Sequence, residues 1–516
     1  MTNEVVIPMG PIRCKAPPDA IPRDFGSITE QTRTRRLFEE KHLLALNITM
    51  YGSWYVVGSN IYFAMLNGGP MGWLFSYIFV AAGVLCQAAS FAEISSIKPV
   101  AGAQYYWTYE FAPPPLKLFL TWIQGWTTWL GYVSMLASTF NTATLLLQGI
   151  INIAYPEWIP TGWQTTLMIL ASITLVTLVN LWAFRAVPWF ELLAGILNIL
   201  LFLTVLILLW VVAPRNSVDV FLVESFAGGW GKFPSFNIGT LSNIYLFVAF
   251  ESTVHLGEET RNPKHAVPAS MFWGFVANAI MGFIMLITYG IVMPSVEEIL
   301  SSVSPLATIV RHGTGSDTAS TVILSGILFG SFAGIIGIHS SVSRLTWAWA
   351  RDGGLSRYFA LVDSKTRVPM RAVLCTTAII VALSLLNLNN KAYIALGAVT
   401  SLSTLSLYSS YTIALSCIIY FRLATPGGLQ LSEWNCGRYG LFFNIFALVY
   451  TVYEIVWLPF PSILPVTAAN MNYAGPVYLV VVLGAVGYWF LWARKNWSGP
   501  NMEVVEIVLN NELSKQ

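Results

Sequence analysis

The sequence predicts an all-α membrane protein with about twelve transmembrane helices. Of its 516 residues, 55% are hydrophobic and only 10% are charged, whereas about 25% of the residues in soluble domains are charged. The apolar residues form long blocks with almost no charge, and about 20 such residues are enough for a helix to cross a bilayer core. Basic residues gather between alternate blocks, as they do in loops that stay in the cytosol.

Twelve blocks bounded by charged residues, proline or glycine are the predicted spans. Several exceed the length of a perpendicular helix, which predicts tilt or extension beyond the bilayer. In chain order the blocks are residues 43–66, 71–94, 117–149, 163–184, 187–213, 238–257, 270–293, 321–349, 372–389, 393–421, 439–460 and 474–494.

The distribution of charge predicts that both termini are cytosolic. With the N-terminus inside, all 27 basic residues fall on the cytosolic side except Arg215, Lys232, Arg311 and Lys391. The expected organisation is one membrane domain between two cytosolic tails. In residue numbers, the tails are 1–42 and 495–516 and the domain is 43–494, comprising two five-helix repeats at about 43–213 and 238–421 and two further helices at about 439–494.

Two spans contain residues that interrupt a helix. In the first span, Gly52-Ser53-Trp54-Tyr55-Val56-Val57-Gly58-Ser59-Asn60 combines two glycines with three small polar residues, and each glycine costs a helix interior about 1 kcal/mol. The alternative interpretation is close helix packing through small residues such as Gly52 and Gly58. Five spans later, residues 250–259 carry a second interruption, FESTVHLGEE.

The two interruptions occupy matching places in the two five-helix halves. Paired interruptions of this kind indicate an inverted-repeat transporter whose substrate site lies near the bilayer midplane. Opened helix ends expose amide groups to an anion and carbonyl groups to a cation in a medium of low dielectric constant. The sequence therefore predicts a substrate site formed by Gly52, Ser53, Trp54, Gly58, Trp126, Phe250, Glu251, Ser252 and His255.

Three segments resemble one family of membrane carriers. ESTVHLGEETRNPKHAVP, from Glu251 to Pro268, is similar to the sixth-helix signature of the amino acid, polyamine and organocation permeases. AEISSIKPVAGAQYYW, from Ala92 to Trp107, resembles the family's second-helix end and the loop after it. RLTWAWARDGGL, from Arg344 to Leu355, resembles the end of its eighth helix.

The resemblance covers roughly residues 43–494 and is strongest to the fungal branch that carries amino acids, including 4-aminobutyrate, or choline. It implies the 5+5 inverted-repeat fold, substrate contact by broken helices 1 and 6, and a plasma membrane location. The first interruption departs from the family's commoner GxG pattern, because it contains the bulky residues Trp54 and Tyr55.

Glu251 is the strongest single candidate. A carboxylate at this depth costs about 2.5 kcal/mol or more unless it faces a cavity or a partner, so we expect it to bind the ammonium group of a substrate. In a continuous helix Glu251 and His255 would share one face and could share a proton. The alternative is a polar pair that only fixes helix packing.

Coupling and cation recognition have further candidates. A proton bound by Glu251 or His255 is the preferred coupling ion, and sodium bound near Ser340 and Ser341 is the alternative. Aromatic rings could hold a cationic group by cation–π attraction, worth about 0.5 to 2 kcal/mol per ring. Besides the rings of the first interruption and Phe250, the candidates are Trp122, Trp126 and Trp129, which share a helical face and could equally form a packing seam.

Charged residues at the predicted cytosolic ends of spans are candidates for an inner gate. Opposite charges there could close the cytosolic end as salt bridges, although interfacial charge that obeys the orientation rule would look the same. The gate candidates are Glu93, Glu258, Glu259, Arg344, Arg351 and Asp352.

Other functional classes are excluded or left as alternatives. Five histidines and five unpaired-looking cysteines are too sparse for a metal site or a membrane enzyme, so we expect no catalytic residues, metal or cofactor. The chain has no GxxxxGK[ST] phosphate loop and no basic stripe for nucleic acid. The expected partners are a bilayer, a small amino acid, amine or choline, and a coupling ion. Transport of other organocations or polyamines, a channel, and a nutrient sensor without transport activity are the alternatives.

Overall fold

The structure is a computed structural model that describes residues 36–388, 392–425, 429 and 432–503. Lys391 and most of the two predicted tails lie outside the described residues. Within the described residues, all regular structure is helical apart from one isolated bridge between Phe38 and Thr260.

Ten helices are long and apolar enough to cross a membrane. The predicted spans agree with them to within seven residues at either end, the largest difference being the start of α12 at Pro263 instead of residue 270. The long third and eighth blocks become helices of 38 and 35 residues. The helices are α5 (Gly69–Ile97), α7 (Lys117–Ala154), α8 (Gly162–Trp182), α9 (Val187–Val212), α12 (Pro263–Val292), α15 (Asp317–Arg351), α16 (Met370–Ser384), α17 (Ala392–Ala424), α18 (Gly440–Trp457) and α19 (Ala474–Tyr488), the last extended by η7 (Trp489–Ala493) and α20 (Arg494–Asn496).

The first predicted span is broken twice, into α2 (Glu40–Tyr51), α3 (Ser53–Ser59) and α4 (Ile61–Leu66). Gly52 separates the first two pieces with a φ of 47°, a left-handed conformation that glycine adopts without steric cost. A Cβ atom at Gly52 would lie 2.1 Å from the ring of Tyr55. The break therefore requires glycine both for its backbone conformation and for space.

The sixth predicted span is also broken. Its first pieces, α10 (Lys232–Gly239) and α11 (Leu241–Phe247), end at a turn, and the chain resumes as the 3₁₀ helix η3 (Ser252–Glu259). Within the turn, Ala249 has a φ of 63°. Together with the ten continuous helices, the two broken ones make the twelve passes that the sequence predicts.

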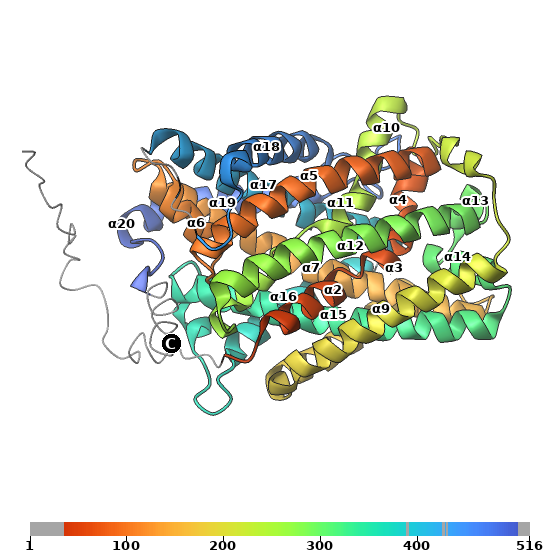
Figure 1. The fold of residues 1–516 in the computed structure, drawn as a ribbon, viewed down its shortest axis with the longest axis horizontal. Coiled ribbons are helices and arrows are strands. Elements are labelled where there is room, and N and C mark those ends of the chain that lie inside the picture. The colour runs from red at the N-terminus through yellow and green to blue at the C-terminus, as the bar shows by residue number, and fades with distance from the viewer. Residues whose placement is uncertain (1–35, 389–391, 426–428, 430–431, 504–516) are drawn as a thin grey trace, which may run out of the picture.

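Short helices close the two ends of the bundle. Figure 1 shows α6 (Gln104–Phe111) and α20 at one end, with α13 (Val296–Ser301) and α14 (Pro305–Thr314) at the opposite end. The remaining short elements are the 3₁₀ turns η1 (Phe184–Ala186), η2 (Val218–Leu222), η4 (Arg357–Ala360), η5 (Leu385–Asn387) and η6 (Gly437–Tyr439).

Helices from the two predicted repeats pack against each other in matching pairs. The second helix of each half, α5 and α12, are in contact, as are the third helices, α7 and α15, and the fourth helices, α8 and α16. The first piece of broken helix 1, α2, packs between α9, α12 and α15. The outward side of α9 is apolar and exposed at Leu193, Ile196, Leu200 and Ile207, as a lipid-facing helix must be.

We expect replacement of Gly52 by alanine to destabilise the fold by about 1–3 kcal/mol, because alanine is strained at a positive φ and its Cβ would overlap Tyr55. Thermal unfolding in detergent measures the loss. Gly484 is a matched control: it lies inside α19 and a Cβ there meets no atom within 4 Å. Equal melting temperatures for the two alanine variants would contradict the expectation.

Candidate functional site

Glu251 lies at the break of helix 6 and is completely buried. Its Oε1 accepts hydrogen bonds from the Gln104 side-chain amide, at 2.6 Å, and from the Tyr132 hydroxyl, at 2.9 Å. Its Oε2 accepts a third from the Tyr411 hydroxyl, at 2.6 Å. All three donors are neutral, and among the described residues no lysine, arginine or histidine forms an ion pair with Glu251. The site therefore holds a buried carboxylate that lacks a cation.

Neighbouring helices bind the backbone that the break leaves open. The Ala249 amide donates to the Tyr411 hydroxyl at 3.0 Å, so one tyrosine holds both the turn and the carboxylate. On the other side, the Ser341 hydroxyl of α15 donates to the Ser252 carbonyl at 2.8 Å. Phe250 stacks on Phe91 with a centroid distance of 5.6 Å. These contacts fix where Glu251 sits.

His255 lies beside this network but forms no hydrogen bond with Glu251 among the described residues. Its Nδ1 lies 2.7 Å from the Ala101 carbonyl, an atom that only accepts, so Nδ1 carries the proton. Its ring meets Tyr132 edge to face at 4.6 Å. The expectation of a shared face assumed an α-helix, whereas residues 252–259 form a 3₁₀ helix with three residues per turn. Tyr132 contacts both side chains instead: its hydroxyl donates to Glu251 and its ring packs against the His255 ring.

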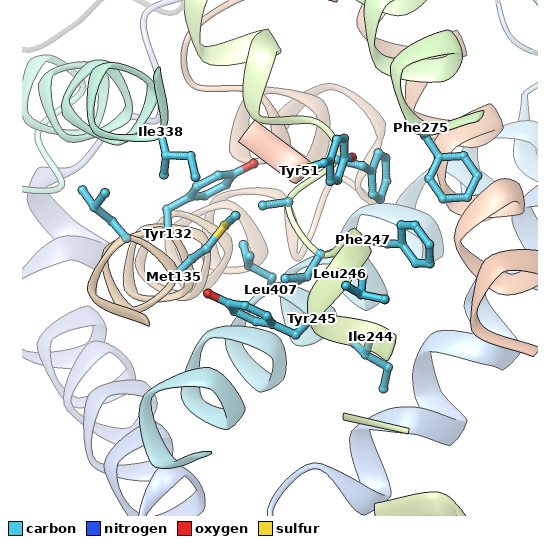
Figure 2. Packing of buried hydrophobic residues seen from close by; sticks show 14 of the residues in the cluster. Tyr51, Tyr132, Met135, Ile244, Tyr245, Leu246, Phe247, Phe275, Ile338 and Leu407 are labelled. Atoms are coloured by element: carbon cyan, nitrogen blue, oxygen red, sulfur yellow. The ribbon is translucent and has the colours of Figure 1, made fainter. Parts of the chain in front are cut away.

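A small cavity of about 50 Å³ lies between the broken helices 1 and 6 and the continuous helices α7 and α15. Figure 2 shows Tyr51, Met135, Tyr245 and Ile338 converging on this region from α2, α7, α11 and α15. Its lining is aromatic, aliphatic and hydroxylic, with no charged side chain. Since a water molecule needs about 10–15 Å³ of such space, the cavity has room for a few water molecules and is too small for an organic solute.

Several predicted substrate residues point elsewhere. The Trp54 indole points toward α9 and does not line the cavity. It donates to the Asn198 side-chain carbonyl of α9 at 2.5 Å. Gly58 lies under α14, and a Cβ there would be 2.8 Å from Leu306. The Ser53 amide bonds to Asn278 of α12. These residues position the broken helix and do not line the cavity.

Trp122, Trp126 and Trp129 belong to a packing seam. Trp126 lies between its two neighbours and Trp349 of α15, with centroid distances of 5.7 to 6.4 Å. The indoles of Trp122 and Trp129 donate to Ala485 and Thr346. The shared helical face is therefore used for contacts with α15 and α19, which differs from the predicted role of Trp126 in substrate binding.

Ser340 and Ser341 do not converge on one ion position. The Ser340 hydroxyl bonds to the Asn180 side chain of α8 at 2.6 Å, while Ser341 reaches the opened backbone of helix 6. Adjacent residues on a helix point about 100° apart, so two neighbouring hydroxyls face different helices. The described residues also contain no group of three or more histidine, cysteine or acidic residues that could hold a metal ion.

A family model described as amino acid permease matches residues 43–483. The chain belongs to the amino acid permease family. A choline transporter of Saccharomyces cerevisiae is 27% identical over 90% of this permease and 83% of the relative. Amino-acid permease 2 of Neurospora crassa is 26% identical, with 90% and 86% covered. A polyamine transporter of Saccharomyces cerevisiae is 24% identical, with 91% and 78% covered.

The predicted gate residues of the permease form buried ion pairs beside α6. Arg344 binds Glu259 at 3.0 Å with both side chains at most 3% exposed, and Arg351 binds both carboxylate oxygens of Glu258 at 3.0 and 3.1 Å. The remaining candidates are bound differently: Asp352 accepts from Tyr105 and from the Asn501 amide, and Glu93 pairs with Arg422 near α18.

Three chain segments cover these ion pairs. The loop after α5 contacts η3 through Ala101, whose amide donates to Glu258 and whose carbonyl accepts from His255. Residues 37–38 form backbone hydrogen bonds with residues 259–261. The Trp497 indole donates to the Asp352 carbonyl at 2.6 Å. This end of the bundle is closed in the structure.

Sequence reasoning missed the three residues that bind Glu251. Gln104, Tyr132 and Tyr411 lie on α6, α7 and α17, more than 100 positions from Glu251 in each case. Tyr132 and Tyr411 stand in ordinary apolar blocks, where an aromatic residue is most often part of the core. Nothing in the local pattern of the sequence distinguishes them.

We expect reversal of one buried gate charge, Arg344→Glu, to reduce the rate of solute exchange strongly, because a broken buried pair costs about 3–5 kcal/mol. The double variant with Glu259→Arg should recover part of the loss, and exchange in proteoliposomes measures the coupling. Reversal of the exposed pair Lys232–Glu224 is the control and should have little effect. A double variant no better than Arg344→Glu alone would contradict a specific pairing.

Proposed function

We propose that this permease is a proton-coupled secondary transporter for amino acids or related small amines such as 4-aminobutyrate. One observation carries the proposal: the Glu251 carboxylate is buried at the break of helix 6 and bound only by neutral donors. A buried charge without a counter-ion is costly, and the ammonium group of a cargo supplies that counter-ion. Binding of the cargo therefore adds the counter-ion that the three neutral donors do not provide.

Transport of choline, another organocation or a polyamine is the alternative function. The cavity next to the break is lined by the rings of Tyr51, Tyr55 and Tyr245, and aromatic faces attract ammonium groups. The printed names of the relatives include choline, amino acids and polyamines, and each of these solutes carries a nitrogen that is or becomes cationic. Glu251 serves all of them, so discrimination must come from the rest of the cavity.

In an alternating-access mechanism, the cavity can be smaller than the cargo in a closed state, because the helices separate before loading. A space of about 50 Å³ excludes the cargo, so loading requires the broken helices to move relative to α7 and α15. The buried pairs Arg344–Glu259 and Arg351–Glu258 act in this proposal as the inner gate. Their opening would expose the cavity on the α6 side.

We place the α6 end in the cytosol, with both chain termini, and the protein in the plasma membrane. Arg215, Lys232 and Arg311 are the described basic residues predicted to face outward, and Lys232 and Arg311 belong to α10 and α14, at or near the end opposite α6 (Figure 1). Loops poor in lysine and arginine are those that cross the membrane during insertion. Labelling of single cysteines from either side of intact cells tests this orientation.

Counterflow in proteoliposomes tests the function itself. Vesicles loaded with amino acids, 4-aminobutyrate, polyamines or choline are diluted into the same labelled solute. A carrier accumulates label transiently for its cargo, a channel shows no exchange, and a nutrient sensor without transport activity shows no flux. Absence of exchange with every solute class, from well-folded protein, would overturn the proposal.

We expect Glu251→Gln to abolish exchange while the protein remains folded, because glutamine keeps the side-chain volume but removes the charge that binds the ammonium group. Size-exclusion profiles verify folding, and labelled exchange measures activity. Glu297→Gln, on an exposed residue of α13, is the control and should exchange normally. Wild-type exchange by the Glu251 variant would remove this residue from the site.

A further inference from the structure

Three carboxylates buried within the described helices have no cationic partner: Glu191, Glu251 and Glu454, each 0% exposed. The other buried acids near the gate are bound to arginines. A membrane-buried carboxylate must be stabilised by donors, by a cation or by a proton. Counting the hydrogen atoms that its neighbours supply shows which of these applies to each residue.

The neighbours of Glu251 satisfy it as an anion. The Gln104 amide and the hydroxyls of Tyr132 and Tyr411 each bring their own hydrogen atom. The carboxylate oxygens receive three hydrogen bonds and supply none. Glu251 is therefore built to keep its charge, which is the form that binds an ammonium group.

Glu191 of α9 has a different environment. Its Oε2 lies 2.6 Å from the Thr49 hydroxyl, and its Oε1 has no hydrogen-bond partner among the described residues. The same hydroxyl lies 2.9 Å from the Leu46 carbonyl and 3.2 Å from the Ala45 carbonyl, and carbonyls only accept. A threonine hydroxyl has one hydrogen atom, and in a helix it commonly donates to a carbonyl of the preceding turn. Even when Thr49 donates this hydrogen to Oε2, Glu191 receives a single hydrogen bond, against three at Glu251, so a proton on its carboxyl group removes the cost of the buried charge.

The position of Glu191 connects it to the break of helix 1. Thr49 lies three residues before Gly52 and lines the central cavity. On the other side α15 approaches closely: a Cβ at Gly334 would be 2.4 Å from the Thr49 carbonyl, and one at Gly337 would be 3.2 Å from Oε1 of Glu191. A negative charge on Glu191 has no room to gain water unless α2 moves away from α9 and α15.

We infer that Glu191 takes up the coupled proton, and that Thr49 transmits its protonation to the broken helix. This inference rests on the proposed transport function and divides the work between two carboxylates: Glu251 binds the cargo and Glu191 carries the proton. The proton closes α2 against α9 and α15, and its release to the cytosol favours the separated arrangement. Cargo movement is thereby tied to proton movement.

We assign proton uptake to the Glu191 carboxylate because the other ionisable groups around it have their own partners or are phenols. Tyr55 faces it from α3 and is a phenol. On α2, His42 accepts from the Glu39 amide and packs against Trp189. On α15, His339 contacts Thr377 and Arg344 is paired with Glu259. None of these forms an ion pair with Glu191 among the described residues.

Glu454 of α18 provides a matched control. Its Oε2 lies 3.0 Å from the Thr240 hydroxyl, which also reaches the Asn237 carbonyl at 2.5 Å, and its Oε1 has no partner among the described residues. The hydrogen count is the same as at Glu191. However, neither Glu454 nor Thr240 lines the cavity between the broken helices. A proton on Glu454 therefore has no contact through which it could affect the break of helix 1.

The test compares Glu191→Gln with Glu454→Gln in proteoliposomes, using whichever solute the wild-type protein exchanges. A gradient of one pH unit supports an about tenfold accumulation at one proton per cargo. We expect the wild type and Glu454→Gln to accumulate cargo in response to this gradient. Glu191→Gln, which stays in the neutral form that favours the closed position of α2, should exchange cargo more slowly and lose the accumulation.

Accumulation by Glu191→Gln equal to that of the wild type would overturn the inference, as would a wild type that exchanges cargo but ignores the pH gradient. A wild type that exchanges no solute would instead overturn the proposed function. If Glu191→Gln does not fold, Thr49→Val and Thr49→Ser replace it. Valine has the shape of threonine without the hydroxyl and should change the midpoint of the pH dependence of exchange, whereas serine should keep it. An unchanged midpoint in the valine variant would reject the role of Thr49.

Infrared difference spectra give a readout that does not depend on transport. A protonated carboxyl group absorbs at a higher frequency than a carboxylate, so titration of the wild-type protein should remove a carboxyl band that is missing from Glu191→Gln. The same band should persist in Glu251→Gln. A band that survives unchanged in Glu191→Gln would show that another group binds the proton.

Discussion

Every backbone amide and carbonyl inside a bilayer needs a partner, because no water is present to replace one. This constraint governs the two broken helices. The Tyr411 hydroxyl receives the Ala249 amide, Ser341 donates to the Ser252 carbonyl, and Asn278 receives the Ser53 amide. Each break exists only because a neighbouring helix supplies the group that a continuous helix would have supplied. Tyr411 also binds the Glu251 carboxylate, so the contact that completes the break of helix 6 helps to position this side chain.

The two broken helices are also bound to each other. Near the end opposite α6, the Ser242 hydroxyl of helix 6 donates to the Asn60 carbonyl and accepts from the Ala64 amide, both of helix 1. At the α6 end, the chain leading into helix 1 forms backbone hydrogen bonds with residues 259–261. A displacement of one broken helix is thus passed to the other, while α7, α12 and α15 supply the surfaces against which both can move.

The positions of the spans and of both breaks could be predicted from the sequence. Apolar blocks of sufficient length identify helices because hydrocarbon tolerates little else, and Gly52 and the polar run from Glu251 to Glu259 conflict with an unbroken membrane helix. The directions of individual side chains could not be predicted in this way. Trp54 and Trp126 stand close to the break or on a suitable face, yet both pack against other helices. The expected contact between Glu251 and His255 failed because η3 has 3₁₀ geometry.

The sequence by itself determined a helical membrane protein of twelve passes with interruptions in helices 1 and 6, since these properties follow from local composition and from the cost of polar groups in lipid. Its likeness to permeases came from three short motifs. Only the tertiary structure decided which groups meet. Gln104, Tyr132 and Tyr411 reach Glu251 from three other helices, and Thr49 meets Glu191 across 142 positions of sequence. Hydrogen bonds between distant segments depend on how helices rotate and pack, and that information is spread over the whole chain.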